Sequence, residues 1–171
     1  ILAGFQAALS ETPDLDAVVY INLNLKVDAR LAATGVRHVL QGADAAIGTR
    51  SEHQGGKVVG AGPLGRAKSI AFNRLVTTVL PQLRPWRDTN APLKVFSPQA
   101  ARMLFENAVI PRVTLDVEWL TLLHASGLRV VPFGVVWTQR PGSSPPWHLV
   151  LRSAVDVVAI RRRWGVPANP A

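Results

Sequence analysis

The chain has 171 residues, of which 48% are hydrophobic and 18% are charged, and this composition excludes an intrinsically disordered protein. It contains no cysteine, which excludes disulfide bonds and thiolate metal sites. Nineteen Lys and Arg residues against eleven Asp and Glu residues give a net charge of +8. This balance favours partners that carry phosphate, such as nucleotides, nucleic acids or lipid phosphates.

We expect one compact domain over residues 1–171, because a chain of this length can bury a sizeable core. No apolar run approaches the ~20 residues of a membrane-spanning helix, and no leader peptide is recognisable. We therefore expect a cytoplasmic protein that is soluble or peripheral at the membrane. The chain opens on Ile1 and has its single methionine at Met103, so we also expect it to be part of a longer protein.

The first part of the chain alternates helical and strand-like patterns. Apolar spacing and turn residues predict a helix at 1–10, a buried strand at 17–23, a helix at 28–40, a short buried strand at 45–47 that ends at Gly48-Thr49-Arg50, and a glycine-rich mobile loop at 51–65.

The second part continues this alternation. The predicted elements are a helix at 68–83, a helix that Ser97 and Pro98 open and that runs to about 107, a helix from about 116 to Gly127, a bent or edge strand at 128–137, and a helix at 147–164. Alternating strands and helices predict an α/β fold with a largely parallel sheet, in which the strand at 18–23 is central.

Six short segments occur in a recognisable order. They are Val18-Val19-Tyr20-Ile21-Asn22-Leu23-Asn24-Leu25, Gly42-Ala43-Asp44-Ala45-Ala46-Ile47-Gly48-Thr49-Arg50, Arg66 with Phe72-Asn73, Asp88-Thr89-Asn90-Ala91-Pro92-Leu93-Lys94-Val95-Phe96, Leu115-Asp116-Val117-Glu118-Trp119-Leu120, and Trp137 ahead of Gly142-Ser143-Ser144. This order resembles the dolichyl-phosphate glucosyltransferase and mannosyltransferase branch of the family 2 glycosyltransferases. Those proteins have Asp-x-Asp after a strand, then Gly-Ser-Arg, Asp-x-x-x-Gly-Phe-Lys, Phe-Asp-x-Glu-Leu and Trp with Gly-Ser.

The resemblance implies the GT-A fold, a mixed α/β sheet flanked by helices, of which this chain would hold the C-terminal two-thirds. It also implies transfer of a hexose from a nucleotide-sugar such as UDP-glucose or GDP-mannose to a polyprenyl or dolichyl phosphate. By resemblance, the catalytic candidates are Asp88, Asp116 and Glu118, and the substrate-binding candidates are Asn22, Asn24, Lys26, Arg50, Arg66 and Lys94. Arginine suits such substrates because its planar donors hold phosphate bidentately.

The chain departs from the family at the metal site. The family implies Mg²⁺ or Mn²⁺ held by Asp-x-Asp, but this chain has Asn22-Leu23-Asn24, with Lys26 close by. Neutral amides are weaker ligands than carboxylates for hard cations, and an ammonium repels them. We therefore predict no metal site of the family's kind. The Gly-Phe of the middle motif is also replaced, by Pro92-Leu93, which removes the backbone freedom of glycine.

Other interpretations of these residues stay open. Asp116 and Glu118 could simply stabilise the first turn of a helix, and Asp88 could form a surface ion pair with Arg87. The arginines at 161–163 could be a solvated helix end, or could make the helix at 147–164 a membrane-surface helix. The whole chain could be a non-catalytic scaffold or binding module. Binding of nucleic acid is not expected, because no nucleic-acid-binding motif accompanies the charge.

Overall fold

The structure is a computed structural model that describes residues 2–12, 14–22, 27–110, 114–139 and 147–165. Its α-helices are α1 (Leu2–Glu11), α2 (Ala32–Leu40), α3 (Pro63–Val79), α4 (Pro98–Asn107), α5 (Leu115–Ala125) and α6 (Trp147–Trp164). Its strands are β1 (Val18–Ile21), β2 (Ala45–Thr49), β3 (Lys57–Val59), β4 (Leu93–Phe96), β5 (Val130–Gly134) and β6 (Val136–Thr138). Short 3-10 helices are η1 (Ala29–Leu31), η2 (Glu52–Gln54) and η3 (Pro81–Leu83).

Two of the predicted helix ends are confirmed in atomic detail. The Ser97 hydroxyl accepts a hydrogen bond of 3.1 Å from the backbone N–H of Ala100, and Pro98 occupies the first turn of α4. Gly127 follows α5 with a φ of 65°, the left-handed conformation that glycine adopts without strain. Local sequence chemistry therefore determines where these two helices begin and end.

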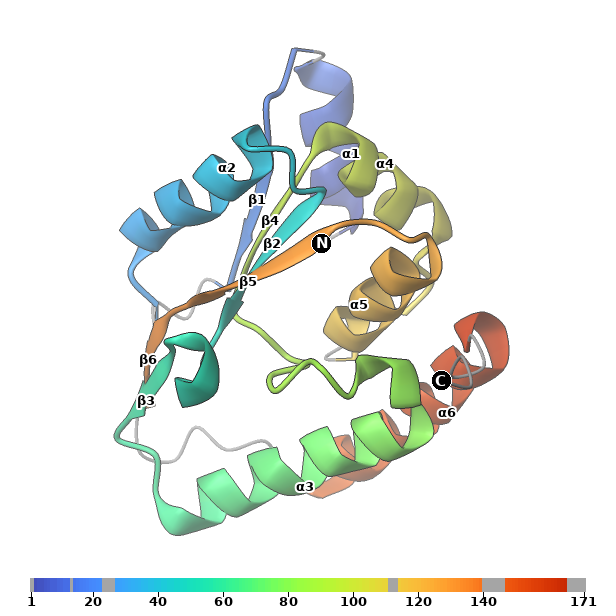
Figure 1. The fold of residues 1–171 in the computed structure, drawn as a ribbon. Helices are drawn as coiled ribbons and strands as arrows, with labels where there is room; N and C mark the ends of the chain where they lie inside the picture. Colours follow the sequence, from blue (N-terminus) through green and yellow to red (C-terminus); the bar gives the residue numbers. More distant parts are fainter. Residues whose placement is uncertain (1, 13, 23–26, 111–113, 140–146, 166–171) are drawn as a thin grey trace.

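The main sheet has four strands in the order β1-β4-β2-β5 (Figure 1). Strand β4 runs antiparallel to β1 and to β2, whereas β2 and β5 are parallel. The sheet is therefore mixed, which confirms the mixed sheet that the family resemblance implies, whereas the largely parallel sheet predicted from the alternation of elements alone is wrong. The prediction of a central strand at 18–23 is also wrong, because β1 lies at one edge of the described sheet. Every residue of β2 and β4 is buried, whereas Val19 of β1 is 43% exposed, as expected of an edge strand.

A second, two-stranded sheet pairs β3 with β6 in parallel. The prediction of a mobile loop at 51–65 is therefore wrong, because this stretch contains η2, β3 and the start of α3. Its glycines allow close backbone contacts: a Cβ atom on Gly56 would lie 2.2 Å from the carbonyl oxygen of Thr49. A three-residue strand is too short to show a periodic pattern in the sequence.

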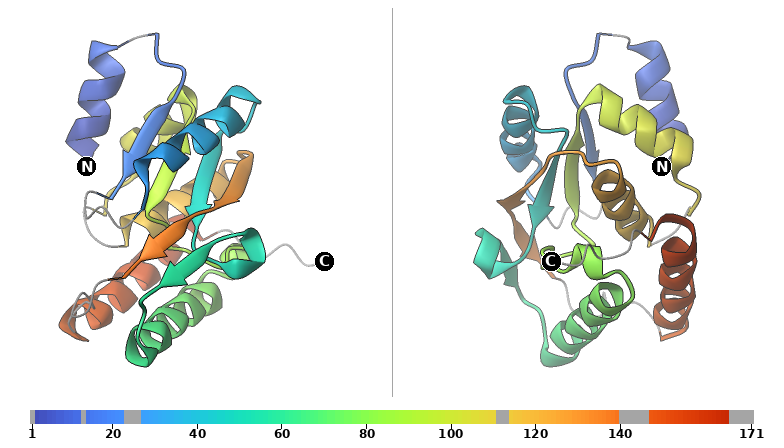
Figure 2. Two further views of the ribbon diagram at one scale, coloured as in Figure 1. Left: turned by 90° about the vertical axis from the view of Figure 1, so that its left-hand side faces the viewer. Right: turned by 45° about the vertical axis from the view of Figure 1, so that its right-hand side comes forward.

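Helices cover both faces of the main sheet (Figures 1 and 2). Helix α2 covers one face, where Val39 packs with Ala46, Val95 and Phe133. Helices α4 and α5 cover the other face, and their core residues pack with Ala45, Ile47 and Phe96. This arrangement of layers gives the inner strands apolar contacts on both sides, which explains why they are fully buried.

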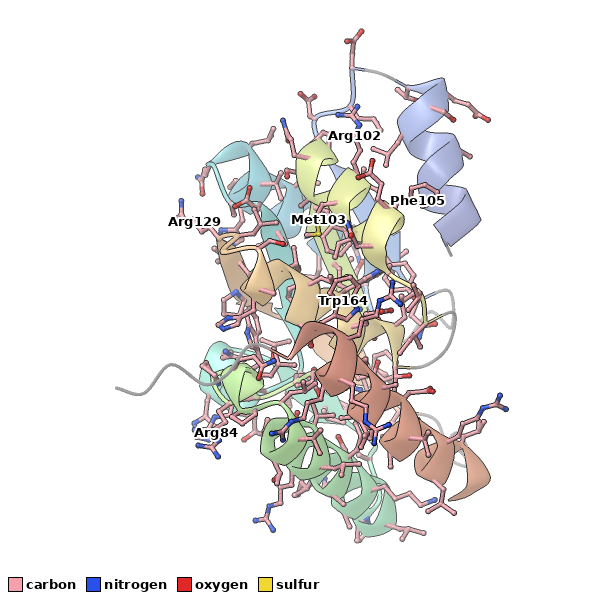
Figure 3. The ribbon with its side chains drawn as sticks, turned by 90° about the vertical axis from the view of Figure 1, so that its right-hand side faces the viewer. Arg84, Arg102, Met103, Phe105, Arg129 and Trp164 are labelled. Atoms are coloured by element: carbon pink, nitrogen blue, oxygen red, sulfur yellow. The ribbon has the colours of Figure 1, made fainter. Side chains whose placement is uncertain are left out.

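Helices α3 and α6 lie side by side at the end of the molecule away from α1 (Figures 1 and 3). One Nη of Arg161 on α6 donates a hydrogen bond of 3.0 Å to the carbonyl oxygen of Val79 on α3. Helix α6 also packs on α5, and there the Thr114 hydroxyl donates a 2.7 Å hydrogen bond to the buried carboxylate of Asp156. None of the described helices has the length and apolar character that crossing a bilayer requires.

Candidate functional site

A cleft of about 310 Å³ opens beyond the carboxyl end of β2. Its walls come from η2, β3, β6, the first turns of α3 and the segment that leads to β4. Arg50, Arg66 and Arg87 line the cleft, together with Asp88 and Trp137. Open α/β sheets commonly bind ligands beyond the carboxyl ends of their strands, so this cleft is the candidate site.

Arg50 and Asp88 form a bidentate ion pair in the wall of the cleft. The Arg50 Nε donates to Asp88 Oδ2 at 2.8 Å, and Nη2 donates to Oδ1 at 2.6 Å. The same Nη2 donates to the carbonyl oxygen of Asn90 at 2.9 Å, and the backbone N–H of Arg50 donates to Asp88. Burial alone would raise the pKa of the Asp88 carboxyl, but the charge and hydrogen bonds of Arg50 outweigh it and lower that pKa. Asp88 is therefore ionised at neutral pH and holds Arg50 in place.

Arg66 and Arg87 reach the cleft from two other elements, the first turns of α3 and the segment before β4. Both are exposed, and among the described residues no ion pair engages either side chain. Asp88 pairs with Arg50 rather than with its neighbour in sequence, Arg87. The guanidinium of Arg50 also lies 5.3 Å from the centre of the Trp137 ring. Of the three arginines in the cleft, Arg50 is thus held by an ion pair, and no described residue forms an ion pair with Arg66 or Arg87.

Lys94 and Asp116 form a second ion pair, which does not line the cleft. Lys94 is fully buried, and its Nζ lies 2.9 Å from Asp116 Oδ1 and donates to the carbonyl oxygen of Ala91. The ammonium also faces the rings of Tyr20 at 4.9 Å and Trp119 at 5.8 Å. Burial raises the pKa of the Asp116 carboxyl, and the Lys94 ammonium offsets only part of this rise. The pair links β4, β1 and α5 inside the core.

Glu118 lies two residues further along α5 and contacts other elements. Its carboxylate accepts hydrogen bonds from the backbone N–H of Val109 at 3.1 Å and of Ile110 at 2.8 Å. It also accepts one of 3.1 Å from the indole N–H of Trp164, at the end of α6 (Figure 3). The side chain is fully buried. Glu118 therefore ties α5 to α6 and to the segment after α4, and it lies apart from the cleft residues.

Of the residues at the position of the family's metal site, the structure describes only Asn22. Asn22 is exposed at the end of β1, and its backbone N–H donates a 3.0 Å hydrogen bond to the carbonyl oxygen of Pro92. Asn24 and Lys26 lie outside the described residues. Within the described part of the chain, no three His, Asp or Glu side chains come together as ligands, and Asp88 and Asp116 are both engaged by cations. These residues do not fit a divalent metal.

The structure thus brings three sequence-predicted residues together in the cleft, namely Arg50, Arg66 and Asp88. It places Lys94 and Asp116 in a separate buried pair, and Glu118 in a third position. Sequence reasoning missed Arg87 as a cleft residue. Its position directly before the Asp88 motif was the available signal, because a residue that flanks a site-forming turn often faces the same space.

No family model matches the chain. Among curated proteins, a dolichyl-phosphate beta-glucosyltransferase of Trichomonas vaginalis is 26% identical over 114 residues, which are 67% of this chain and 33% of that protein. A dolichyl-phosphate beta-glucosyltransferase of Dictyostelium discoideum is 33% identical over 79 residues, which are 46% of this chain and 24% of that protein. The matched region thus spans about a third or less of these relatives.

Among solved structures, the chain is similar to glucosyl-3-phosphoglycerate synthase from Mycobacterium tuberculosis in complex with Mn²⁺, uridine diphosphate and glucosyl-3-phosphoglycerate. The TM-score is 0.62 at 14% identity, and the match covers 99% of this chain and 56% of that one. A second structure of that enzyme, with phosphoglyceric acid, gives a TM-score of 0.56 at 15% identity. At such identities the likeness shows the fold, which is the GT-A fold of glycosyltransferases.

Proposed function

This chain is a relative of the family 2 glycosyltransferases of the polyprenyl-phosphate glucosyltransferase branch, and from this premise we propose that it transfers a hexose from a nucleotide-sugar to a polyprenyl or dolichyl phosphate. The donor would be of the UDP-glucose or GDP-mannose kind. The curated relatives named above support this proposal, as does the GT-A fold. The observation that carries it is the arginine-lined cleft, because both substrates present phosphate groups.

The proposal assigns different roles to the three arginines. Arg66 and Arg87, whose guanidinium groups form no ion pair within the described part of the chain, hold phosphate oxygens in the cleft. Arg50 is held by Asp88 and Asn90, so it offers a fixed positive charge that needs no rearrangement when substrate arrives. Asp88 is then a positioning residue that acts through Arg50, and Glu118 is a structural one.

In the reaction, an oxygen of the acceptor phosphate attacks the anomeric carbon of the donor sugar. The new bond between carbon and oxygen forms as the bond from that carbon to the donor diphosphate breaks, and the nucleoside diphosphate leaves with the electron pair. A phosphate monoester is largely ionised near neutral pH, with a second pKa of about 6, so the nucleophile needs no general base. This agrees with the pairing of Asp88 and Asp116 to cations. The chain's own residues position the two substrates and neutralise their charge.

No step of this proposal uses a divalent metal, because the described carboxylates do not fit one. Positive charge on the diphosphate would come from arginine instead, and Lys26 could add to it. We therefore expect donor binding and transfer to be insensitive to chelators.

The test is a transfer assay with dolichyl phosphate and either UDP-glucose or GDP-mannose, together with donor binding by calorimetry, each with Mn²⁺ and then with EDTA. Arg66→Gln and Arg87→Gln should each lower kcat/KM about 10- to 100-fold, the range expected for a lost hydrogen bond to a charged group. Arg37→Gln, an exposed arginine on α2, is the matched control and should keep full activity.

Three outcomes would count against the proposal in different ways. A strict need for Mn²⁺ would show that a metal site exists despite Asn22 and Asn24. Full activity of both cleft variants would place the phosphates elsewhere. Failure of any donor to bind would favour the alternative considered from the sequence, a non-catalytic glycosyltransferase-like scaffold or binding module.

A further inference from the structure

Helix α6 exposes a row of apolar side chains on its outer face. Its buried face carries Ser153 and Asp156 beside Val157 and Ile160. Its exposed face carries Leu151, Val155 and Val158, whose side chains are 70%, 69% and 40% exposed. These three residues follow the spacing i, i+4, i+7, so they form one stripe along the helix. An exposed apolar stripe of this kind is typical of a docking surface.

The stripe continues into a wide groove beside α6. Val109 and Ile110, from the segment after α4, form the opposite side of this groove, and Trp164 closes one end. Val109 is itself 50% exposed, so the apolar surface extends beyond the helix. The hydrogen bonds that Val109, Ile110 and Trp164 donate to the Glu118 carboxylate hold the two sides of the groove together. The docking surface is therefore preformed.

The exposed charges beside the stripe are positive. Arg152, Arg162 and Arg163 are exposed beside the stripe, whereas the only acidic residue of α6, Asp156, is buried and bonded to Thr114. The neighbouring helix α3 carries Arg66, Lys68 and Arg74 and no acidic residue. The exposed acids among the described residues are Glu11, Asp14, Asp16, Asp28, Glu52 and Glu106, and none of them lies on α3 or α6, although Glu52 lines the cleft. The exposed charges of α3 and α6 are thus positive.

We infer that the exposed face of α6 docks on the surface of an anionic lipid bilayer. Apolar side chains flanked by arginines, with no exposed acid on the helix itself, form the pattern of an interfacial helix: the apolar residues enter the headgroup region while the cations meet lipid phosphates. A second copy of this chain would present the same cations and would be repelled at this face, so the charge favours a membrane over a homodimer.

This docking would also bring the candidate site close to the lipid. Helix α3 packs beside α6 and supplies Arg66 and Ile70 to the wall of the cleft, and Leu64 and Ile70 on α3 are themselves exposed. The inference does not depend on the transfer reaction, because vesicle binding is measured without any donor.

The experiment is flotation of the whole chain with vesicles of phosphatidylcholine alone, or of equal parts phosphatidylcholine and phosphatidylglycerol. We expect binding to the anionic vesicles and much weaker binding to the neutral ones, with the difference lost at high salt. The double variant L151Q/V155Q should weaken partitioning about tenfold, and R162Q and R163Q about fivefold each. The matched controls lie on α2, on the other side of the sheet: Leu40→Gln removes a leucine that is 64% exposed, and Arg37→Gln removes an exposed arginine.

Circular dichroism melting of every variant excludes loss of fold as the cause. Equal binding to both kinds of vesicle, or equal losses in the α6 and α2 variants, would overturn the inference. Absence of vesicle binding would also overturn the inference. In that case sedimentation shows whether the chain is a monomer or a dimer, and a dimer that L151Q/V155Q dissociates would identify a second copy of the chain as the occupant of this surface. Retained vesicle binding together with a failed transfer assay would refute the proposed function and leave the membrane surface intact.

Discussion

Replacing Lys94 by methionine should expose how much the buried pair with Asp116 matters to the fold. Methionine has a similar length, so the change removes the ammonium and leaves the packing against Tyr20 and Trp119 largely in place. The Asp116 carboxylate, which is buried and lies 2.9 Å from Lys94 Nζ, then loses its nearest cation. Breaking a buried pair in this way typically costs about 3–5 kcal/mol. We expect a loss of that size in the free energy of unfolding at pH 7.

The loss should depend on pH, with a sign that follows from the direction of the Asp116 shift. Burial already raises the pKa of this carboxyl in the native protein, and removal of Lys94 raises it further. A raised pKa in the folded state means that protonation favours folding. The penalty in Lys94→Met is therefore smallest below the raised pKa that Asp116 has with Lys94 present. It grows by up to about 1.4 kcal/mol per pH unit from there until the still higher pKa of the variant is passed.

Urea unfolding of Lys94→Met at pH 7 and near pH 4.5 measures both effects. The double variant with Asp116→Leu removes the second charge as well and should recover most of the lost stability, because apolar pairs often replace buried ion pairs at little cost. A penalty that is the same at both pH values, and that the double variant does not relieve, would refute the reasoning. It would show that Lys94 acts through its contacts with the rings and with Ala91 instead.

Two further predictions concern the other buried carboxylates. Because Arg50 lowers the pKa of Asp88, this carboxyl adds stability above the ordinary aspartate pKa of about 4, and that stability is lost as the pH falls towards the lowered value. The free energy of unfolding of Asp88→Asn should therefore be about 3–5 kcal/mol lower than that of the unchanged protein at neutral pH, and it should depend less on pH in the acid range. An unchanged dependence on acid pH would contradict the assignment. Glu118→Ala should lower the free energy of unfolding by about 2–4 kcal/mol, because three N–H donors lose their acceptor. Calorimetric melting checks this, and a stable but inactive Glu118→Gln would instead favour a catalytic role.

The helices of this fold could be predicted because each carries its own signal. Ser97 before Pro98 and the glycine at 127 are local features, and they act in the structure as expected. The strand order could not be predicted in this way, because the pairing of β4 between β1 and β2 depends on contacts between distant segments. Strand β3 carries no local signal of its own, since it has three residues and its partner is more than seventy positions away.

The candidate site was predictable only as far as the family resemblance reached. Arg50, Arg66 and Asp88 were identified through their motifs, but nothing in the motifs shows that Asp88 is occupied by Arg50. Nor could the sequence separate Asp116 from Glu118, which are two residues apart on one helix. A step of two residues turns the side chain to nearly the opposite side of a helix, so one faces Lys94 and the other faces Trp164.

The junction between β5 and β6 has a mechanical consequence. These strands are separated by Val135 alone, yet β5 belongs to the main sheet and β6 to the small one. The backbone of Gly134 lies so close to the turn after η2 that a Cβ atom there would come within 2.1 Å of the carbonyl oxygen of Gly55. Trp137 on β6 and Arg50 after β2 are therefore wall residues on a single stiff frame. We therefore expect this side of the cleft to keep its width when ligands bind, and any adaptation to substrate size to come from the first turns of α3.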